Sequence, residues 1–134
     1  MQVQPYLFFD GRCQEAIDFY RQALGAEVGM VMHYKDSPVQ TSAPPGSEDK
    51  VMHASLRIGQ TDVHMSDGMC NGSPSFQGFS LCVTPPDGAA AQRVFAALGD
   101  GGTVTMPLGK TFFASSFGMV TDRFGVGWMV MVQG

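Results

Sequence analysis

The chain has 134 residues, 44% hydrophobic and 15% charged, which is enough for one domain with a buried core. Its net charge of −4 and the lack of a basic run argue against nucleic acid as a partner. No apolar stretch approaches the ~20 residues of a membrane span, and the N-terminus lacks a signal-peptide pattern, so we expect a cytoplasmic protein without a membrane partner. The three cysteines form no Cys-x-x-Cys pair, and we interpret them as buried or incidental thiols rather than as a zinc site or a redox pair.

The first half predicts a strand, a helix and three further strands. The helix has apolar residues at three-four spacing, Asp10 as a candidate cap, and Gly25 at its end. The last two strands alternate apolar and polar residues, as half-buried antiparallel strands do. The predicted elements are a strand at Tyr6–Phe9, a helix at Arg12–Leu24, strands at Val28–Tyr34, Val51–Ile58 and Thr61–Ser66, and a loop at Lys35–Asp49.

The second half repeats this order from Gly78. Asp87 is a candidate cap for its helix, and Leu98-Gly99 ends that helix as Leu24-Gly25 ends the first. The predicted elements are an apolar strand at Ser80–Val83, the helix, a strand at Thr103–Met106, a loop or irregular strand at Pro107–Ser116, and strands at Phe117–Asp122 and Gly127–Val132. The chain therefore predicts an α+β fold with βαβββ twice, and duplicated units pack together because neither buries its apolar face alone.

Several motifs, taken in order, resemble one known family. They are Pro5-Tyr6-Leu7, Ala16-Ile17-Asp18-Phe19-Tyr20 before Leu24-Gly25-Ala26, His53-Ala54, Met65-Ser66-Asp67, Lys110-Thr111-Phe112, Phe117-Gly118, and Asp122-Arg123-Phe124-Gly125-Val126 before Trp128-Met129. Together they resemble the PhnB-like branch of the vicinal oxygen chelate superfamily. That superfamily includes glyoxalase I, extradiol dioxygenases, and fosfomycin- and bleomycin-resistance proteins. The resemblance covers essentially the whole chain.

The resemblance implies an architecture and a place for the site. The two βαβββ modules would form a curved mixed sheet around a cleft, within a single domain and in a homodimer. We expect module one at residues 1–67, a linker at 68–77 and module two at 78–134.

The resemblance also implies where a divalent metal would be held. The positions that match the family's ligands fall near Pro5, at His64, near Gly78, and at Trp128 or Met129. Of these side chains, only an imidazole suits Zn, Ni, Mn or Fe(II). We therefore expect no standard catalytic metal and no other cofactor.

Four polar residues share the face of two strands that we expect to be neighbours: His53, Ser55, His64 and Ser66. If these strands pair, the four line one wall of the cleft. The histidines then act either as a proton shuttle, since an imidazole titrates near working pH, or as hydrogen-bonded sheet residues without chemistry. A third alternative is that both histidines bind a metal ion, which would need a carboxylate partner. Asp62, on the same face, is the best candidate for that partner, and Asp67 follows in the next loop.

Aromatic residues and one lysine are further candidates for ligand binding. Lys110 either reaches an anionic ligand or lies solvated in its loop. Small-molecule sites need an apolar or stacking lining, and candidates for it are Tyr6, Phe8, Phe113, Phe117 and Trp128. By parity, we expect some of these five to pack under the helices instead. The turn at Asp122-Arg123-Phe124-Gly125 is interpreted as structural.

These patterns favour a protein that binds a small, partly apolar organic ligand without a standard metal. The alternative is a metal-dependent lyase, isomerase or dioxygenase. Members of the branch are often described as related to a demethylubiquinone methyltransferase, but methyl transfer of the usual kind needs a glycine-rich turn that opens a helix. Gly99-Asp100-Gly101-Gly102 follows a helix, so we do not expect methyl transfer.

Overall fold

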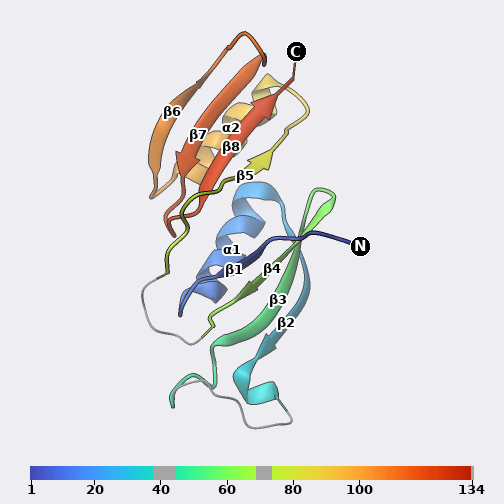
Figure 1. The fold of residues 1–134 in the computed structure, drawn as a ribbon, viewed down its shortest axis with the longest axis vertical. Coiled ribbons are helices and arrows are strands. Elements are labelled where there is room, and N and C mark those ends of the chain that lie inside the picture. The colour runs from blue at the N-terminus through green and yellow to red at the C-terminus, as the bar shows by residue number, and fades with distance from the viewer. Residues whose placement is uncertain (38–44, 69–73, 134) are drawn as a thin grey trace. The chain divides into compact units, whose positions relative to one another are not determined.

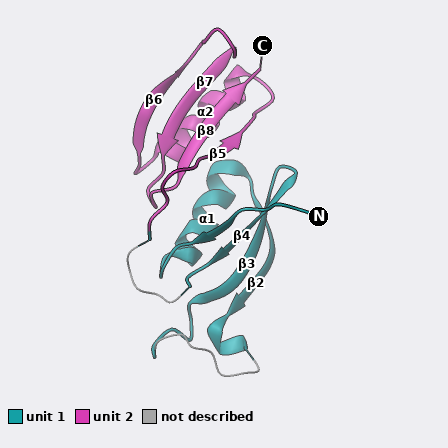
Figure 2. Cartoon of the chain, in the orientation of Figure 1, with its two compact units in different colours: residues 1–74 teal, residues 75–134 magenta. Residues whose placement is uncertain are grey.

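The computed structural model describes residues 1–37, 45–68 and 74–133. The chain divides into two compact units, residues 1–74 and 75–134 (Figures 1 and 2). Within the described residues, each unit contains one α-helix and one four-stranded mixed sheet. The boundary falls within residues 68–77, the segment that we predicted to be a linker, and the exact module limits stay a prediction.

The first unit follows the predicted order of elements. Its elements are β1 (Tyr6–Phe8), α1 (Cys13–Leu24), β2 (Glu27–His33), a short 3-10 helix (Tyr34–Asp36), β3 (Val51–Ile58) and β4 (Thr61–Ser66). The strand order is β1-β4-β3-β2, with β1 parallel to β4 and the other pairs antiparallel. The sequence did not predict the 3-10 helix, and part of the predicted loop Lys35–Asp49 lies outside the described residues.

The second unit repeats this topology, which confirms the α+β fold and the tandem βαβββ order. Its elements are β5 (Leu81–Val83), α2 (Gly88–Gly99), β6 (Thr103–Gly109), β7 (Ser116–Thr121) and β8 (Gly127–Val132). The strand order is β5-β8-β7-β6, again with one parallel pair at β5 and β8. β6 continues past the predicted end at Met106 because it is an edge strand, where Pro107 needs no ladder partner for its nitrogen.

The alternation along the strands places the core of the first unit between its sheet and α1. Leu7, Ala54 and Leu56 are almost fully buried, and the helix residues Ile17 and Tyr20 are buried as well. Burying a leucine side chain contributes about 1.5–3 kcal/mol, so this apolar face fixes the strand register. The residues between the buried ones point to the other face of the sheet.

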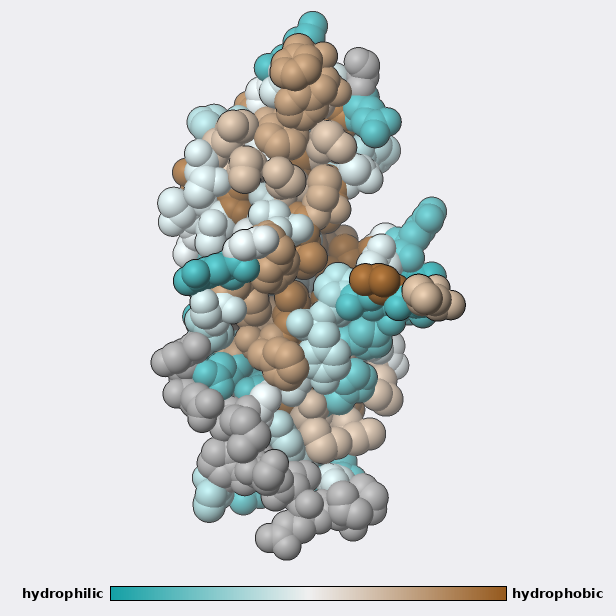
Figure 3. Space-filling view, in the orientation of Figure 1, coloured by the Kyte–Doolittle hydropathy of each residue, from teal (hydrophilic) through white to brown (hydrophobic). Residues whose placement is uncertain are grey.

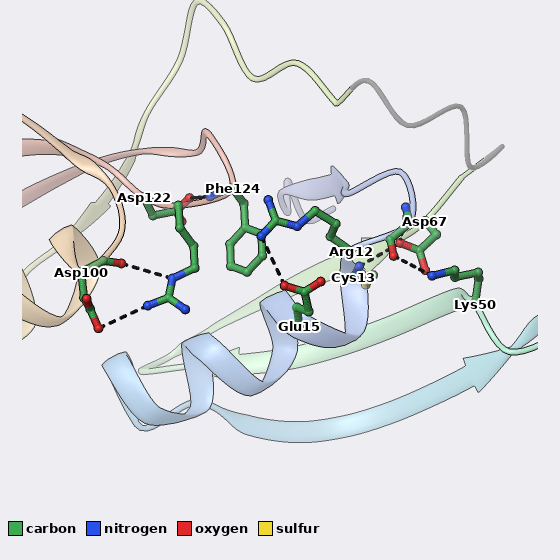
Figure 4. Close-up of polar contacts among 10 residues, drawn as sticks. Arg12, Cys13, Glu15, Lys50, Asp67, Asp100, Asp122 and Phe124 are labelled. Atoms are coloured by element: carbon green, nitrogen blue, oxygen red, sulfur yellow. Dashed lines mark hydrogen bonds and ion pairs between the residues drawn. The ribbon is translucent and has the colours of Figure 1, made fainter.

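The start of α1 differs from the prediction. Asp10 does not occupy the cap position: its backbone is left-handed (φ 55°), and Arg12 stands there without a capping hydrogen bond from its side chain. Asp67 does this work from the end of β4, where its Oδ1 accepts from the backbone N–H of Gly11 (2.7 Å) and Cys13 (2.8 Å; Figure 4). The predicted cap of α2 is confirmed, since Asp87 accepts from the N–H of Ala90 at 2.8 Å.

The turn between β7 and β8 is built around a buried carboxylate. Asp122 is 3% exposed, and its Oδ1 accepts from the N–H groups of Phe124 and Val126 at 2.9 and 3.1 Å (Figure 4). Gly125 has a φ of 94°, which a side chain would strain.

Among the described residues, neither helix is long and apolar enough to cross a membrane.

Candidate ligand-binding site

The open face of the first sheet, opposite α1, brings together six of the residues that we predicted for the site. Tyr6 pairs with His64 across β1 and β4, and Ser55 pairs with His64 across β3 and β4. Residues that pair directly across strands point to the same face, as do residues two apart on one strand. The six residues are Tyr6, Phe8, His53, Ser55, His64 and Ser66. We call them the ring face.

Four rings on the ring face lie in contact. The ring centroids of Tyr6 and Phe8 are 4.9 Å apart and stacked, and those of Tyr6 and His64 are 5.8 Å apart and stacked. His53 and His64 stack at 5.5 Å. Phe8 is 53% exposed and Tyr6 is 42% exposed. The sheet thus presents a partly open aromatic surface.

Hydrogen bonds fix the polar edges of these rings. The Tyr6 hydroxyl lies 2.9 Å from Nδ1 of His53, and burial raises the pKa of Tyr6 above its ordinary value. The tyrosine therefore stays protonated, and its hydrogen bond with Nδ1 holds the two rings side by side. Nε2 of His64 lies 2.8 Å from Oε1 of Gln4, so Nε2 carries the proton and donates to that oxygen.

This arrangement leaves one ring nitrogen without a partner. With its proton on Nε2, neutral His64 has a lone pair on Nδ1, and this buried atom has no hydrogen-bond partner among the described residues. Buried polar atoms in folded proteins are rarely left in this state, and an exception asks for an explanation. A ligand that donates one hydrogen bond would satisfy it after a small movement of the neighbouring rings.

A divalent cation of the kind that the resemblance implies does not fit the side chains of the ring face. Within the described residues, no group of three or more His, Cys, Asp or Glu side chains is placed to hold a metal. His64 already uses Nε2 on Gln4, and a hard or borderline cation needs several nitrogen or oxygen ligands. The absence of a metal from the working protein stays a prediction.

Of the predicted site residues in the second unit, Phe113 and Phe117 are brought together and Trp128 is not. The rings of Phe113 and Phe117 meet edge to face at 5.1 Å, and Lys110 is exposed in the same loop as Phe113. Trp128 is 2% exposed, and its indole donates to Oδ2 of Asp122 at 2.9 Å. Its side chain belongs to the core beneath α2, so we leave it out of the proposed site.

The sequence analysis missed Gln4, Met30 and Met32. Met30 pairs with Ser55 and Met32 with His53, so both methionines border the ring face. Gln4 lies before the predicted strand, but the period of two that links Tyr6 and Phe8 extends back to it. This alternation could therefore have predicted that Gln4 lies on the same face as Tyr6 and Phe8. The bulge between Val28 and Met30 removed such a signal on β2.

One wide depression lies elsewhere on the first unit. It has a volume of about 540 Å³ and is lined by Asp18, Arg21, Gln22, Gly25 and Ala26 at the C-terminal end of α1. α1 packs on the other side of the sheet from the ring face. The lining of the depression is mostly polar and lacks aromatic rings, so we do not place the ligand there.

The comparisons with known proteins agree with this fold. The model of the family described as 3-demethylubiquinone-9 3-methyltransferase matches residues 1–131. Protein YjdN of Escherichia coli is 38% identical over 140 aligned positions, which cover 98% of this chain and 95% of that protein. The chain belongs to the 3-demethylubiquinone-9 3-methyltransferase family. The predicted PhnB-like membership is thereby confirmed.

Several solved structures superpose on the chain along nearly its whole length. Protein PA1353 of Pseudomonas aeruginosa has a TM-score of 0.87 at 43% identity, covering 99% of this chain and 98% of that one. The PhnB protein of Bacillus cereus has a TM-score of 0.82 at 27% identity, covering 98% and 99%. A glyoxalase/bleomycin resistance/dioxygenase domain from Frankia, 11% identical with a TM-score of 0.66, covers 99% and 95% and shows the shared fold alone.

The family's description names a methyl transfer that this chain's residues do not fit. S-adenosylmethionine is usually held at a glycine-rich turn between a strand and a helix of a parallel sheet. Here the turn from β1 to α1 contains Asp10-Gly11, and the connection from β5 to α2 contains Thr84-Pro85-Pro86. Both sheets are mixed, with one parallel pair each.

Proposed function

We propose that this protein binds a small, partly aromatic organic molecule on the ring face of its first unit, without a standard catalytic metal. The observation that carries the proposal is the cluster of the Tyr6, His53 and His64 rings beside Nδ1 of His64, a buried atom without a hydrogen-bond partner among the described residues. Binding alone is a sufficient function for such a surface. Small-molecule sites combine an apolar lining with a few fixed polar groups, as this face does.

The chemistry of the ring face narrows the ligand. Phe8 and Tyr6 offer ring faces for stacking, which contributes about 0.5–1.5 kcal/mol for each aromatic pair beyond area burial. His64 offers a hydrogen-bond acceptor at Nδ1, and Ser55 offers a hydroxyl that can donate or accept. The ligand class is therefore a planar molecule with an N–H or O–H group at its edge.

A second candidate function is proton transfer to or from the bound molecule. The observation that favours it is again the lone pair on Nδ1 of His64, because a neutral imidazole can take a proton near neutral pH. The hydrogen bond between the Tyr6 hydroxyl and Nδ1 of His53 holds the second imidazole ring in place beside His64. No observation on the described residues favours a metal-dependent lyase, isomerase or dioxygenase.

We also propose that the protein is a homodimer. The edge strands β2 and β6 expose apolar residues at equivalent places in the two modules: Val28 is 40% exposed and Val104 is 49% exposed. Each valine pairs with a residue of the neighbouring strand, and a bulge in the edge strand follows directly after it. Edge strands with exposed apolar side chains are prone to pair with another chain.

A thermal-shift screen of small aromatic and phosphonate compounds tests the main proposal. A ring-stacking compound with one donor group should raise the melting temperature of the natural protein. The shift should shrink in His53→Ala and persist in His33→Ala, the matched control, whose histidine pairs with Asp36 at the end of β2. Equal shifts in both variants would refute the placement of the ligand on the ring face.

A further inference from the structure

Four sulfur-bearing side chains form one transverse row across the sheet of the second unit. Cys82 on β5 pairs with Met129 on β8, and Met129 pairs with Met119 on β7. Met119 in turn pairs with Met106 on β6. The strand order is β5-β8-β7-β6, so the row takes one residue from every strand. We call these four residues the sulfur row.

The sulfur row lies on the face of the sheet that α2 does not cover. A Cβ added to Gly118 would lie 2.6 Å from Cε1 of Phe95 on α2, so position 118 faces the helix and Met119 points away. On β8, Val130 is fully buried while its neighbour Met129 is only half-buried. Because paired residues share a face, Cys82 and Met106 lie on the open side with them.

The residues of the sulfur row are exposed or half-buried and have apolar neighbours. Cys82 is an exposed free thiol, and Met106 is 44% exposed. The next row along the sheet pairs Phe117 with Met131, and Phe113 packs on Phe117. Figure 3 shows apolar side chains gathered on the visible face over the strands of this unit.

We propose that the sulfur row binds one soft monovalent cation, Cu(I) or its analogue Ag(I), through Cys82, Met129 and Met119. Thiolate and thioether sulfurs are the ligands that select Cu(I) over harder ions. On binding, Cys82 releases its thiol proton to water and forms the metal–thiolate bond, while the two thioethers donate lone pairs and stay neutral. One cation enters and one proton leaves, so the site keeps its charge.

The spacing of the strands suits this coordination. Neighbouring strands lie about 4.8 Å apart. Metal–sulfur bonds of about 2.3 Å in a trigonal arrangement keep the ligand atoms roughly 4 Å from one another. Cys82 and Met129 meet this spacing with little adjustment, and the long side chain of Met119 reaches the ion from the next strand. Met106, at the sheet edge, extends the row and is not needed for three ligands.

The competing explanation is that these methionines form only an adaptable apolar wall. The two explanations differ in what sulfur itself contributes. Replacing methionine by leucine keeps the apolar volume and removes the thioether, so it should abolish cation binding and leave an apolar wall nearly intact.

The test is an anaerobic titration of the full chain with Cu(I), using bicinchoninate as a coloured competitor. We expect one ion per chain. Loss of even an outer-shell partner weakens metal binding by about 10–100-fold, so Cys82→Ser and the double variant Met119→Leu/Met129→Leu should each weaken it at least tenfold. The matched control, Met30→Leu/Met32→Leu in the first sheet, should bind as the natural chain does.

Methyl NMR with Ag(I) supplies the second readout and guards against a misfolded variant. In the natural protein, Ag(I) should shift the methyl signals of Met119 and Met129 and leave those of Met30 and Met32 in place. No stoichiometric Cu(I) binding would overturn the proposal. Binding abolished by Cys70→Ser instead of Cys82→Ser, or unchanged in Met119→Leu/Met129→Leu, would overturn it as well.

Discussion

At the scale of single residues, two buried carboxylates organise the backbone of their units. Asp67 is 1% exposed and accepts three backbone N–H groups, from Gly11, Cys13 and Val51, so it ties β3, β4 and the start of α1 together. Asp122 does the same for the turn between β7 and β8. The carboxylate of Asp67 is thus occupied by backbone donors, and that of Asp122 by backbone donors and the indole N–H of Trp128, so both residues have a structural role.

Replacing Asp67 should therefore cost stability. In Asp67→Asn, an amide NH₂ must face a backbone N–H that formerly donated to Oδ1 or Oδ2. Leaving such a buried donor unsatisfied costs about 1–3 kcal/mol. Urea unfolding should show this loss. The control is Asp62→Asn, which breaks an exposed ion pair with Arg57 and should cost about 0.2–1 kcal/mol. Equal losses in the two variants would contradict the role of Asp67.

Cys13 gives a prediction of pH dependence. Burial, and then the nearby charge of Asp67, strongly raise the pKa of this thiol, so it stays protonated in the folded protein. The unfolded chain loses that proton above the ordinary thiol pKa of 9.0. The unfolded state then binds fewer protons, and the free energy of unfolding falls with rising pH by up to about 1.4 kcal/mol per unit.

Urea unfolding between pH 8 and pH 10.5 measures this slope. Cys13→Ala should be less stable than the natural protein at neutral pH because it leaves a cavity, but its stability should fall less steeply above pH 9. Cys82→Ala, which removes an exposed thiol, should keep the steep fall. Parallel profiles for Cys13→Ala and the natural chain would show that the thiol does not carry the effect.

At the scale of elements, β7 and α2 approach more closely than side chains allow at one position. A Cβ at Gly118 would lie 2.6 Å from the ring of Phe95 and 3.0 Å from the Cα of Leu108. Gly118→Ala should destabilise the protein by about 1–3 kcal/mol, as overpacking of a core does. Gly109→Ala, in the neighbouring strand with open space around its Cα, should change the melting temperature little.

The elements also show what the sequence could predict. Alternation in Val51–Ile58 and Thr61–Ser66 depends on one buried face, and it predicted both strands and the shared face of His53 and His64 correctly. The helix ends were harder. Asp87 caps its own helix and was predictable, whereas the donors to Asp67 at the start of α1, Gly11 and Cys13, lie more than fifty positions away in the sequence. Such contacts depend on the tertiary fold and leave no local pattern.

For the ring face, the sequence predicted which residues share a side of the sheet but not how they bond. The alternation of residues along the two strands placed His53, Ser55, His64 and Ser66 together. The hydrogen bonds of Gln4 and Tyr6 to the two histidines depend on side-chain rotamers, which no spacing encodes. The prediction that Trp128 lies in the site was wrong, because the register of β8 places its indole on the buried face of the sheet.

At the scale of the whole molecule, two copies of one unit have come to carry different surfaces. The first sheet presents rings and hydrogen-bonding groups, and the second presents thioethers and a thiol. Each βαβββ unit keeps the buried residues that determine its fold, while the residues on the open face of its sheet can differ. The recurrence of exposed valines on the two edge strands is the shared feature that we connect with self-association.

The dimer should respond to charge at those edges. Val28→Glu and Val104→Glu place like charges on an interface between copies and cost several kcal/mol there, so at least one should give a monomer in analytical ultracentrifugation. Glu15→Lys, on the exposed side of α1, is the control and should leave the sedimentation unchanged. A monomeric natural chain, or dimers in all three variants, would contradict the proposed interface.

The central claim is that the ring face is where the ligand binds. The most direct measurement is an NMR titration of histidine ring signals with a hit from the compound screen. The account predicts shifts for the rings of His53 and His64, none for His33, and at least tenfold weaker binding in His53→Ala, about 1.4 kcal/mol. A compound that binds the natural protein while the rings of His53 and His64 stay unchanged would contradict it.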